Sequence, residues 1–187
     1  MGKRQNPALA DGSHDSSVAA TADEFTREFP WVDRTTVESH LAFVQAHAVL
    51  SSTLARKYAE LGTSVSRFNA LRILHYAPER RLTIRGLGTR LGVSSASVTR
   101  LVDGLIRDGW VRRVGGDTDK RVTHVELLDS GEARFVSLLP RVMTIWNEVW
   151  DCLDADEKKS LVSLNSKLRS RLVSSQKADV DLDLVEY

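Results

Sequence analysis

The stretch from Thr83 to Leu128 constrains the fold of this chain more than any other part, because three signals follow one another on it. A short helix-turn-helix pattern comes first and an amphipathic helix second. A basic hairpin comes last, with strands at 110–114 and 122–127. A helix-turn-helix followed at once by a two-stranded wing supplies one element for the major groove of DNA and another for the backbone or minor groove. The order of these signals therefore predicts a DNA-binding lobe.

The charge of the chain is concentrated on the same stretch. Between Arg80 and His124 there are ten Arg and Lys residues against four Asp, a local net charge of +6, although the whole chain carries only +1. Binding to phosphates requires such a local excess of positive charge. The charge distribution therefore agrees with the prediction from the motif.

The amphipathic helix of the motif has two distinct faces. Its apolar residues repeat as i, i+3, i+4, i+7 and i+8 and are expected to face the core; they are Val98, Leu101, Val102, Leu105 and Ile106. The outer face is expected to carry Ser97, Arg100, Gly104 and Arg107. Thr83 is expected to cap the first helix of the motif, Gly92 to end it, and Gly109 to close the amphipathic helix.

The polar residues that open the amphipathic helix are the candidates for DNA contact. Ser94 is best explained as the N-cap. Ser95, Ser97 and Arg100 point away from the apolar stripe, and an arginine can bind guanine through two hydrogen bonds. Thr99 belongs to the same candidate set, and an ordinary solvated face is the alternative.

Three short motifs give the chain a resemblance to a known family. They lie at 101–105 (LVDGL), 109–113 (GWVRR) and 117–121 (DTDKR), and the last leads into the strand 125–127 (VEL). Over about residues 36–173 the chain resembles the MarR family of bacterial transcription regulators. The resemblance implies a homodimeric winged-helix regulator, usually a repressor that is released by a small ligand or by oxidation.

The resemblance also assigns roles to residues of the motif. The base-reading positions of the family fall on Ser95, Ser97 and Arg100. The tip of the wing, which approaches the minor groove in the family, falls on Asp119, Lys120 and Arg121. In the family the last arginine often pairs with an acid at the start of the recognition helix. That position is serine here, so a bracing role and a DNA contact both stay open for Arg121.

The helix before the recognition helix departs from the family pattern. It has Gly86 and Gly88 where the family usually has Glu-Leu-Ala. Each glycine costs roughly 1 kcal/mol relative to alanine inside a helix. The sequence therefore predicts a soft helix at this place.

A ligand site is suggested by the first long helix. His47, with Tyr58 eleven residues later, resembles the first helix of a urate-responsive subgroup of the family. That subgroup also has a Trp in an N-terminal helix, which Trp31 can match, and an Asp that reads here as Asn69. The candidate ligand-binding residues are thus Trp31, His47, Asn69 and Arg72, for a small aromatic or anionic effector. A histidine packed at a dimer interface is the alternative for His47.

The rest of the chain divides into tails and helices. Residues 1–22 are expected to form a disordered tail, 23–175 the regulator domain, and 176–187 an acidic tail. The fold class is mostly α with a small β-wing. A winged helix-turn-helix DNA-binding lobe at about 64–128 is joined to a helical dimerisation lobe. The lobe consists of helices at about 36–61 and 130–175. Within the latter, an apolar seam is expected to pair two chains; it consists of Val136, Leu139, Met143, Trp146, Trp150 and Leu153.

Several function classes do not fit the sequence. There is no nucleophile with a base and an orienting group, and no Gly-rich phosphate loop, so we expect neither an enzyme nor a cofactor. The five histidines lack the spacing of metal ligands. No apolar run approaches the ~18–20 residues that span a bilayer, and no secretory signal is evident, which favours a cytoplasmic protein. Cys152, the only cysteine, is expected to be a buried structural thiol rather than a peroxide sensor.

These observations lead to one functional expectation and one rival. We expect a homodimeric repressor that binds a palindromic operator in double-stranded DNA and responds to a small-molecule effector. The rival from another class is a non-DNA helical dimer module that uses the apolar seam to bind a partner protein or a small ligand.

Overall fold

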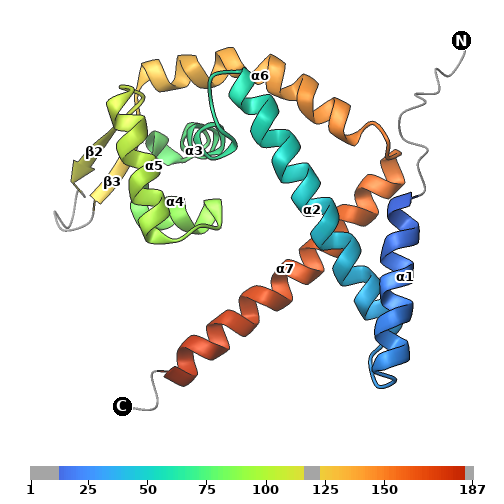
Figure 1. Ribbon diagram of the computed structural model, residues 1–187. Helices are drawn as coiled ribbons and strands as arrows, with labels where there is room; N and C mark the ends of the chain where they lie inside the picture. The colour runs from blue at the N-terminus through green and yellow to red at the C-terminus, as the bar shows by residue number, and fades with distance from the viewer. Residues whose placement is uncertain (1–12, 116–122, 184–187) are drawn as a thin grey trace, which may run out of the picture. The chain divides into compact units, whose positions relative to one another are not determined.

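The computed structural model describes residues 13–115 and 123–183, and the chain divides into two units, residues 1–135 and 136–187. The structure is mostly helical with one small antiparallel sheet (Figure 1), which confirms the predicted fold class. The elements in chain order are α1 (Ser13–Glu28), α2 (Arg34–Glu60), α3 (Val65–His75), a 3-10 turn (Pro78–Arg80), β1 (Arg81–Thr83), α4 (Ile84–Leu91), α5 (Ser95–Arg107), β2 (Val111–Gly115), β3 (Thr123–Leu127), α6 (Asp129–Trp150) and α7 (Ala155–Asp183).

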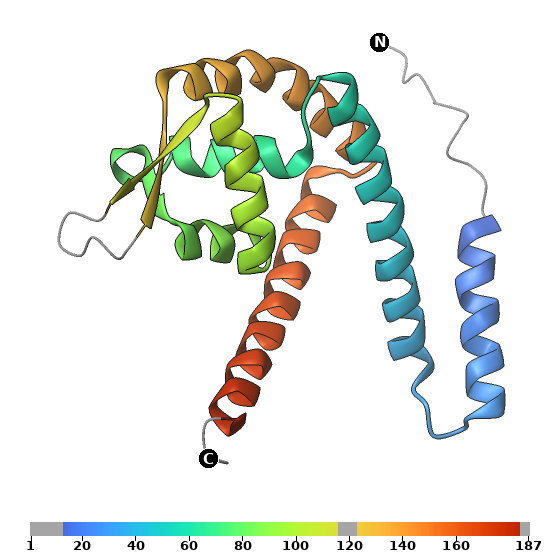
Figure 2. The same cartoon turned by 60° about the vertical axis from the view of Figure 1, so that its left-hand side comes forward.

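In the first unit, α1 and α2 lie side by side, as both Figure 1 and Figure 2 show. Ala22 of α1 is fully buried, and Asp23 pairs with Arg34 of α2 at 2.8 Å. The expected disordered tail was wrong for residues 13–22, which are helical. Contacts made by α1 outweigh the polar, aperiodic composition that suggested disorder. Residues 1–12 lie outside the described part of the chain.

Helix α2 is long and largely uncovered in the single chain. It begins after Asp33, whose carboxylate accepts hydrogen bonds from the backbone and hydroxyl of Thr36 at 2.7 and 2.6 Å. These bonds hold the pKa of the Asp33 carboxyl below its ordinary value. Among the residues of α2, only Tyr58 is buried. Apolar side chains of α2, among them Phe43, Val44 and Val49, therefore lie at the surface of the single chain.

The winged part of the unit is built from α3, α4, α5 and the sheet, which has the strand order β1-β3-β2. The wing strands pair antiparallel with Val111 opposite Leu127 and Gly115 opposite Thr123. This is the predicted hairpin. The short strand β1 was not predicted; it pairs antiparallel with β3 and forms one edge of the sheet, opposite β2.

The core of the winged part lies among α3, α4, α5 and the sheet. Its fully buried side chains come from all of these elements and include Phe68, Leu71, Leu74, Leu87, Val98, Val102, Leu105, Val111 and Val125. An aromatic chain extends the core, because the ring of Phe68 lies 5.7 Å from that of Tyr58 and 5.4 Å from that of Phe135. Such a core fixes the position of α5.

The second unit holds most of α6 and all of α7. The predicted capping box opens α7: Asp154 N donates to Glu157 Oε2 at 2.8 Å and Glu157 N to Asp154 Oδ1 at 2.9 Å. The helix continues to Asp183, so the expected tail at 176–187 is helical as far as the structure describes it. Cys152 lies exposed in the turn between α6 and α7, which corrects the expected buried thiol.

Candidate nucleic-acid interface

Helix α5 begins with a serine cap. The Ser94 hydroxyl oxygen accepts from Ser97 N at 3.4 Å, and the same hydroxyl donates to Ser97 Oγ at 3.1 Å. The cap satisfies one of the amide groups that the first turn of a helix leaves without an intrahelical acceptor. The prediction that Ser94 is a cap is confirmed.

The preceding helix ends as predicted. Thr83 caps α4 by accepting from Gly86 N at 2.9 Å, and Gly92 ends α4 with a left-handed backbone (φ 68°). The turn of the helix-turn-helix is thus built by a threonine cap, a glycine and a serine cap. It sets the direction in which α5 leaves α4.

The two faces of α5 differ sharply in burial. Val98, Val102 and Leu105 are completely buried, whereas Leu101 and Ile106 are half-buried. Gly104 was expected on the outer face but is buried, because it faces Arg67 of α3. Without Gly104, the exposed polar face of α5 consists of residues in the N-terminal half of the helix and of Arg107.

The DNA-contact candidates lie on the outer face of α5. Ser95, Thr99 and Arg100 are exposed and Ser97 is half-buried. The Thr99 hydroxyl donates to the Ser95 carbonyl at 3.0 Å, so it keeps its lone pairs as acceptors. Arg100 forms no ion pair with any residue in 13–115 or 123–183, and its donors are open to a ligand.

The exposed arginines of the wing strands differ from Arg100, because they are paired. Arg112 binds Glu126 across the strands at 2.8 Å, and this bond raises the pKa of Arg112. Arg113 binds Asp103 of α5 at 2.7 Å. The second pair joins the wing to the recognition helix. It was not predicted from the sequence, because the family resemblance suggested a brace between Arg121 and the position of Ser94.

The connection from α5 to the wing is short and fully hydrogen-bonded. Gly109 has a φ of 70°, its amide donates to Ile106 O at 2.9 Å, and Trp110 N donates to Leu105 O at 3.0 Å. These two bonds form a Schellman motif, which ends the helix as predicted. β2 starts directly afterwards, so the wing is held close to the end of α5.

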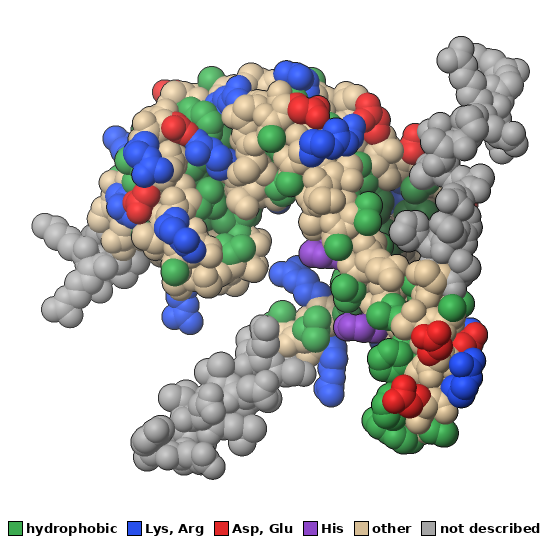
Figure 3. All heavy atoms as spheres, in the orientation of Figure 1, with side chains coloured by type: hydrophobic (Ala, Val, Ile, Leu, Met, Phe, Trp, Pro, Cys, Tyr) green, Lys and Arg blue, Asp and Glu red, His purple; other side chains and the backbone are tan. Residues whose placement is uncertain are grey.

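The predicted wing tip, Asp119, Lys120 and Arg121, lies outside the described residues. Positive side chains are nevertheless spread over the lobe that holds α4, α5 and β2, as Figure 3 shows. The exposed arginines of these three elements are Arg85, Arg90, Arg100, Arg107, Arg112 and Arg113. The basic surface thus includes both helices of the helix-turn-helix and the first wing strand.

The four ligand candidates lie on three different segments of the first unit. Trp31 is in the turn after α1, rather than in a helix, and is 84% exposed. His47 is exposed on α2, where it stacks on Phe43 with the ring centres 6.4 Å apart. Asn69 and Arg72 are neighbours on α3, joined by a bond from Arg72 Nε to Asn69 Oδ1 of 3.3 Å. The contacts of the described residues bring only the last two together.

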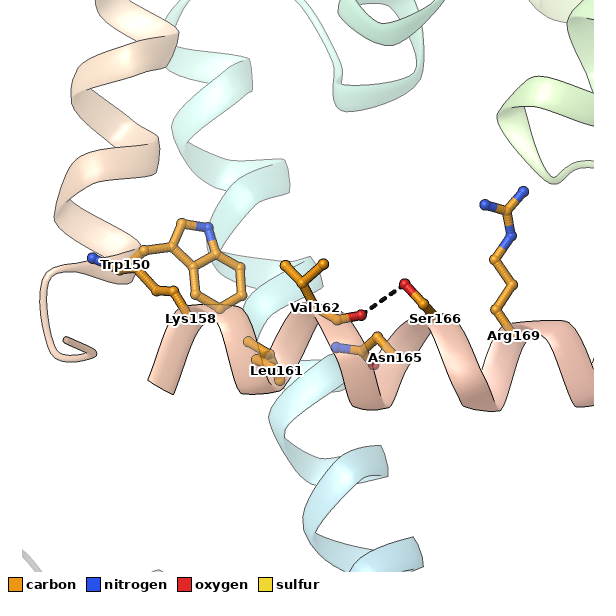
Figure 4. A pocket seen from close by; sticks show the side chains of 7 residues that line it. All are labelled: Trp150, Lys158, Leu161, Val162, Asn165, Ser166 and Arg169. Carbon is orange, nitrogen blue, oxygen red and sulfur yellow. Dashed lines mark hydrogen bonds between the residues drawn. The ribbon is translucent and has the colours of Figure 1, made fainter. Parts of the chain in front are cut away.

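A hollow of about 430 Å³ lies in the second unit, between the end of α6 and α7 (Figure 4). Trp150 and the aliphatic side chains of Leu161 and Val162 form its apolar part, and Lys158 and Arg169 carry its charge. None of the four ligand candidates belongs to this unit. Most of its lining belongs to α7, the helix that also carries several exposed apolar side chains.

The described residues form neither a metal site nor a membrane-spanning helix. No group of three or more His, Cys, Asp or Glu side chains in 13–115 and 123–183 is arranged to hold a metal ion. Within the same residues no helix has the length and apolar character needed to cross a membrane.

A capped helix-turn-helix, an exposed polar face on its second helix and a braced two-stranded wing define a winged helix-turn-helix protein. Comparison with solved structures agrees. A MarR family transcriptional regulator from Streptomyces coelicolor, Sco3205, solved in complex with DNA, superposes with a TM-score of 0.72 at 24% identity, covering 76% of this chain and 90% of that one.

Comparison with sequences gives the family. The MarR family profile matches residues 61–122. The transcriptional repressor YetL of Bacillus subtilis is 30% identical over 149 residues, which cover 80% of this chain and 89% of YetL. The transcriptional repressor MprA of Escherichia coli K12 is 30% identical over 122 residues, covering 65% of this chain and 69% of MprA. This chain belongs to the MarR family and is a transcriptional regulator, as the sequence motifs predicted.

Proposed function

We propose that the protein is a repressor that binds a palindromic operator as a homodimer, with α5 in the major groove and the wing on the backbone or minor groove. One observation carries the proposal: Arg100 is the exposed arginine on the N-terminal half of α5, and it is unpaired among the described residues. Arg112 and Arg113, by contrast, are held in ion pairs. An arginine left open on the outer face of a recognition helix is suited to bidentate binding of guanine.

The other candidate residues receive roles by position. Ser95, Ser97 and Thr99 would contact bases or phosphates beside Arg100. Asp119, Lys120 and Arg121 would place the wing tip on the backbone. Because Asp103 already pairs with Arg113, bracing of the wing does not depend on Arg121, and we assign Arg121 to DNA.

Exposed apolar side chains support the dimer. On α7 Leu164 is 66% exposed and Leu172 55%, and on α2 Phe43, Val44 and Val49 are also exposed. In the α6 seam, Val136 and Trp150 are exposed while the opposite face, with Val142, is buried. Apolar surface of this extent is rarely left open by a monomer, and a two-fold dimer would cover it.

Two-fold symmetry would present two recognition helices to the DNA. Their half-sites are then expected to lie about 10 bp apart, which is one helical turn. Selection of binding sites from a random DNA pool tests this spacing. A selected site without an inverted repeat contradicts the symmetric dimer.

We further propose that a small aromatic or anionic effector releases the repressor, with Trp31, His47, Asn69 and Arg72 as candidate contacts. The Asn69–Arg72 pair supports an anionic group, because it combines a positive charge with an amide on one face of α3. Titration of the protein–operator complex with urate and with benzoate tests release. Asn69→Ala and Arg72→Ala should raise the ligand concentration that releases the operator. If neither urate nor benzoate releases it, these two compounds are not effectors of the protein.

A salt titration separates the DNA-binding regulator from the non-DNA helical module. Binding to random duplex DNA should weaken steeply as salt rises, because each neutralised phosphate releases counterions. Lys120→Ala should weaken binding to operator and random DNA alike and lower the log–log slope by about one. A protein that retains no random DNA even at low salt would instead favour the helical module.

A further inference from the structure

Three arginines from three helices lie near one another at the C-terminal end of α5, away from the DNA-contact residues, and two of them lie against Trp110. Arg67 comes from α3, Arg107 from the last turn of α5 and Arg134 from the first turns of α6. The Arg67 guanidinium lies 4.7 Å from the Trp110 ring centre and that of Arg134 lies 5.7 Å from it. The fold therefore places Arg67 and Arg134 against one aromatic side chain, and Arg107 is close enough to Arg67 for their charges to interact.

Only part of this positive charge is compensated. Arg67 Nη2 forms an ion pair with Asp108. Arg134 Nη2 donates to the carbonyls of Leu61 and Gly62, at 3.0 and 3.3 Å. Arg107 is exposed and has no ion-pair partner in the described parts of the chain. The burial of Arg67, and after it the charges of Arg107 and Arg134, lower the pKa of Arg67, as expected where like charges are packed together.

A glycine forms the floor of the space between two of these arginines. A Cβ placed on Gly104 would lie 3.5 Å from Arg67 Nη1 and 3.8 Å from Arg107 Nη2. The two guanidinium groups thus converge over a stretch of bare backbone. Any residue other than glycine would fill that space with its own side chain.

We propose that Arg67 and Arg107, over Gly104, form a binding site for a phosphate group. Guanidinium groups bind phosphate oxygens through charge-assisted hydrogen bonds, and donors arriving from two different helices suit a tetrahedral anion. Arg107 supplies a guanidinium that has no ion-pair partner within 13–115 and 123–183, and Arg67 supplies Nη1 while Nη2 stays with Asp108. The phosphate is either free in solution or part of a DNA backbone, and the two sources are separated below.

The first measurement uses the full-length protein without DNA. Thermal unfolding is followed in millimolar inorganic phosphate and in chloride at equal ionic strength and pH. Phosphate should raise the midpoint temperature in a saturable way. Arg107→Gln should weaken the fitted phosphate affinity about tenfold to a hundredfold, the effect of losing hydrogen bonds to a charged group. Arg90→Gln, which removes another exposed arginine without a described partner, should behave like the wild type.

A second variant protects the test against a loss of folding. Gly104→Ala meets only ordinary contacts and favours the helix, so the protein should fold, yet the methyl group occupies the proposed site. It should reduce phosphate affinity as Arg107→Gln does. An equal response of the wild type and all three variants would mean a general effect of phosphate on proteins and would overturn the proposal. Absence of a saturable response in the wild type would overturn it too.

The source of the phosphate follows from binding to random duplex DNA. If the site holds a backbone phosphate, Arg107→Gln lowers the salt slope by about one relative to the wild type. If the slope of Arg107→Gln equals that of the wild type, the phosphate is a free one. Both results keep the site, provided that the DNA-free measurement is positive. A wild type that fails to bind DNA contradicts the proposed function and leaves the phosphate measurement intact.

Discussion

Helices α5 and α7 have similar apolar periodicity and opposite burial. In α5 the apolar positions 98, 102 and 105 are completely covered by α3, α4 and the sheet. In α7 Leu164, Leu168 and Leu172 repeat every four residues, which also places them on one helical face, and all three are exposed. The first helix is therefore stable within its own chain, whereas the second has an apolar face that its own unit leaves open.

The difference shows what an apolar stripe means. Periodicity in a sequence identifies a face that avoids water, but it does not identify what covers that face. For α5 the cover is the core of the winged part. For α7 the proposed cover is a second copy of the chain. The comparison can be tested by changing each helix separately.

The largest expected effect is on association through α7. Leu168→Glu should convert the dimer into a monomer, at a cost of about 5 kcal/mol or more, because symmetry buries the unpaired charge twice. Sedimentation at micromolar concentration measures this, and Lys167→Glu, one position along the helix, serves as the control and should remain dimeric. A wild type that is already monomeric, or a dimeric Leu168→Glu, contradicts the comparison.

The next largest effect concerns the covered face of α5. Leu105→Ala should lower the free energy of unfolding by about 2–5 kcal/mol, because it opens a cavity at a completely buried position. Leu101→Ala should cost less, since Leu101 is only half-buried. Urea unfolding at one fixed protomer concentration measures both, because dimer stability depends on concentration. If both substitutions lower the free energy of unfolding equally, burial in the single chain does not determine how much each residue contributes to stability.

The outer face of α5 should affect DNA binding and leave stability unchanged. Arg100→Ala should weaken operator binding by about 1–3 kcal/mol, while the urea midpoint stays that of the wild type. Arg112→Ala is the matched control, because Arg112 is also exposed but is bound to Glu126. If Arg100→Ala binds the operator with wild-type affinity, Arg100 does not contact the operator bases.

The smallest effect is expected at the contact between α4 and α5. A Cβ on Gly88 would lie 2.9 Å from Val98 Cγ2, so Gly88→Ala should destabilise the protein by about 1–2 kcal/mol despite the better helix propensity of alanine. Gly104→Ala, which meets no such contact, should instead stabilise it by up to about 1 kcal/mol. Differential scanning calorimetry compares the two, and a more stable Gly88→Ala would mean that α4 and α5 can separate without cost.

Local features of the fold were predictable from the sequence. The caps at Thr83, Gly92 and Ser94, the closing Gly109 and the wing hairpin depend on neighbouring residues, and the structure confirms them. The strand β1 was missed because three residues are too few to show an alternating pattern. Its stability comes from pairing with β3, far along the chain.

Features that depend on contacts across the fold were harder to predict. Gly88 looked like a weakness of α4, but its missing side chain lets α5 approach. Gly104 looked exposed on a helical projection, but Arg67 of another helix covers it. The Asp103–Arg113 pair needs the tight turn at Gly109 to bring its partners together, and neither residue belongs to the motif that suggested a brace. Cys152 was judged by the usual burial of cysteine, whereas its exposure follows from the place where α6 ends.

The Schellman turn at Gly109 and the Asp103–Arg113 pair also determine how α5 and the wing contribute together to the affinity for DNA. Two modules joined by a flexible linker bind in sequence, and the second meets its target at an effective concentration set by the linker. Here the linker between α5 and β2 is three residues long and the modules are also tied by an ion pair, so the entropy of aligning them is lost during folding rather than during binding. The helix and the wing therefore act as one bidentate ligand for DNA. Weakening either one should reduce the residence time of both.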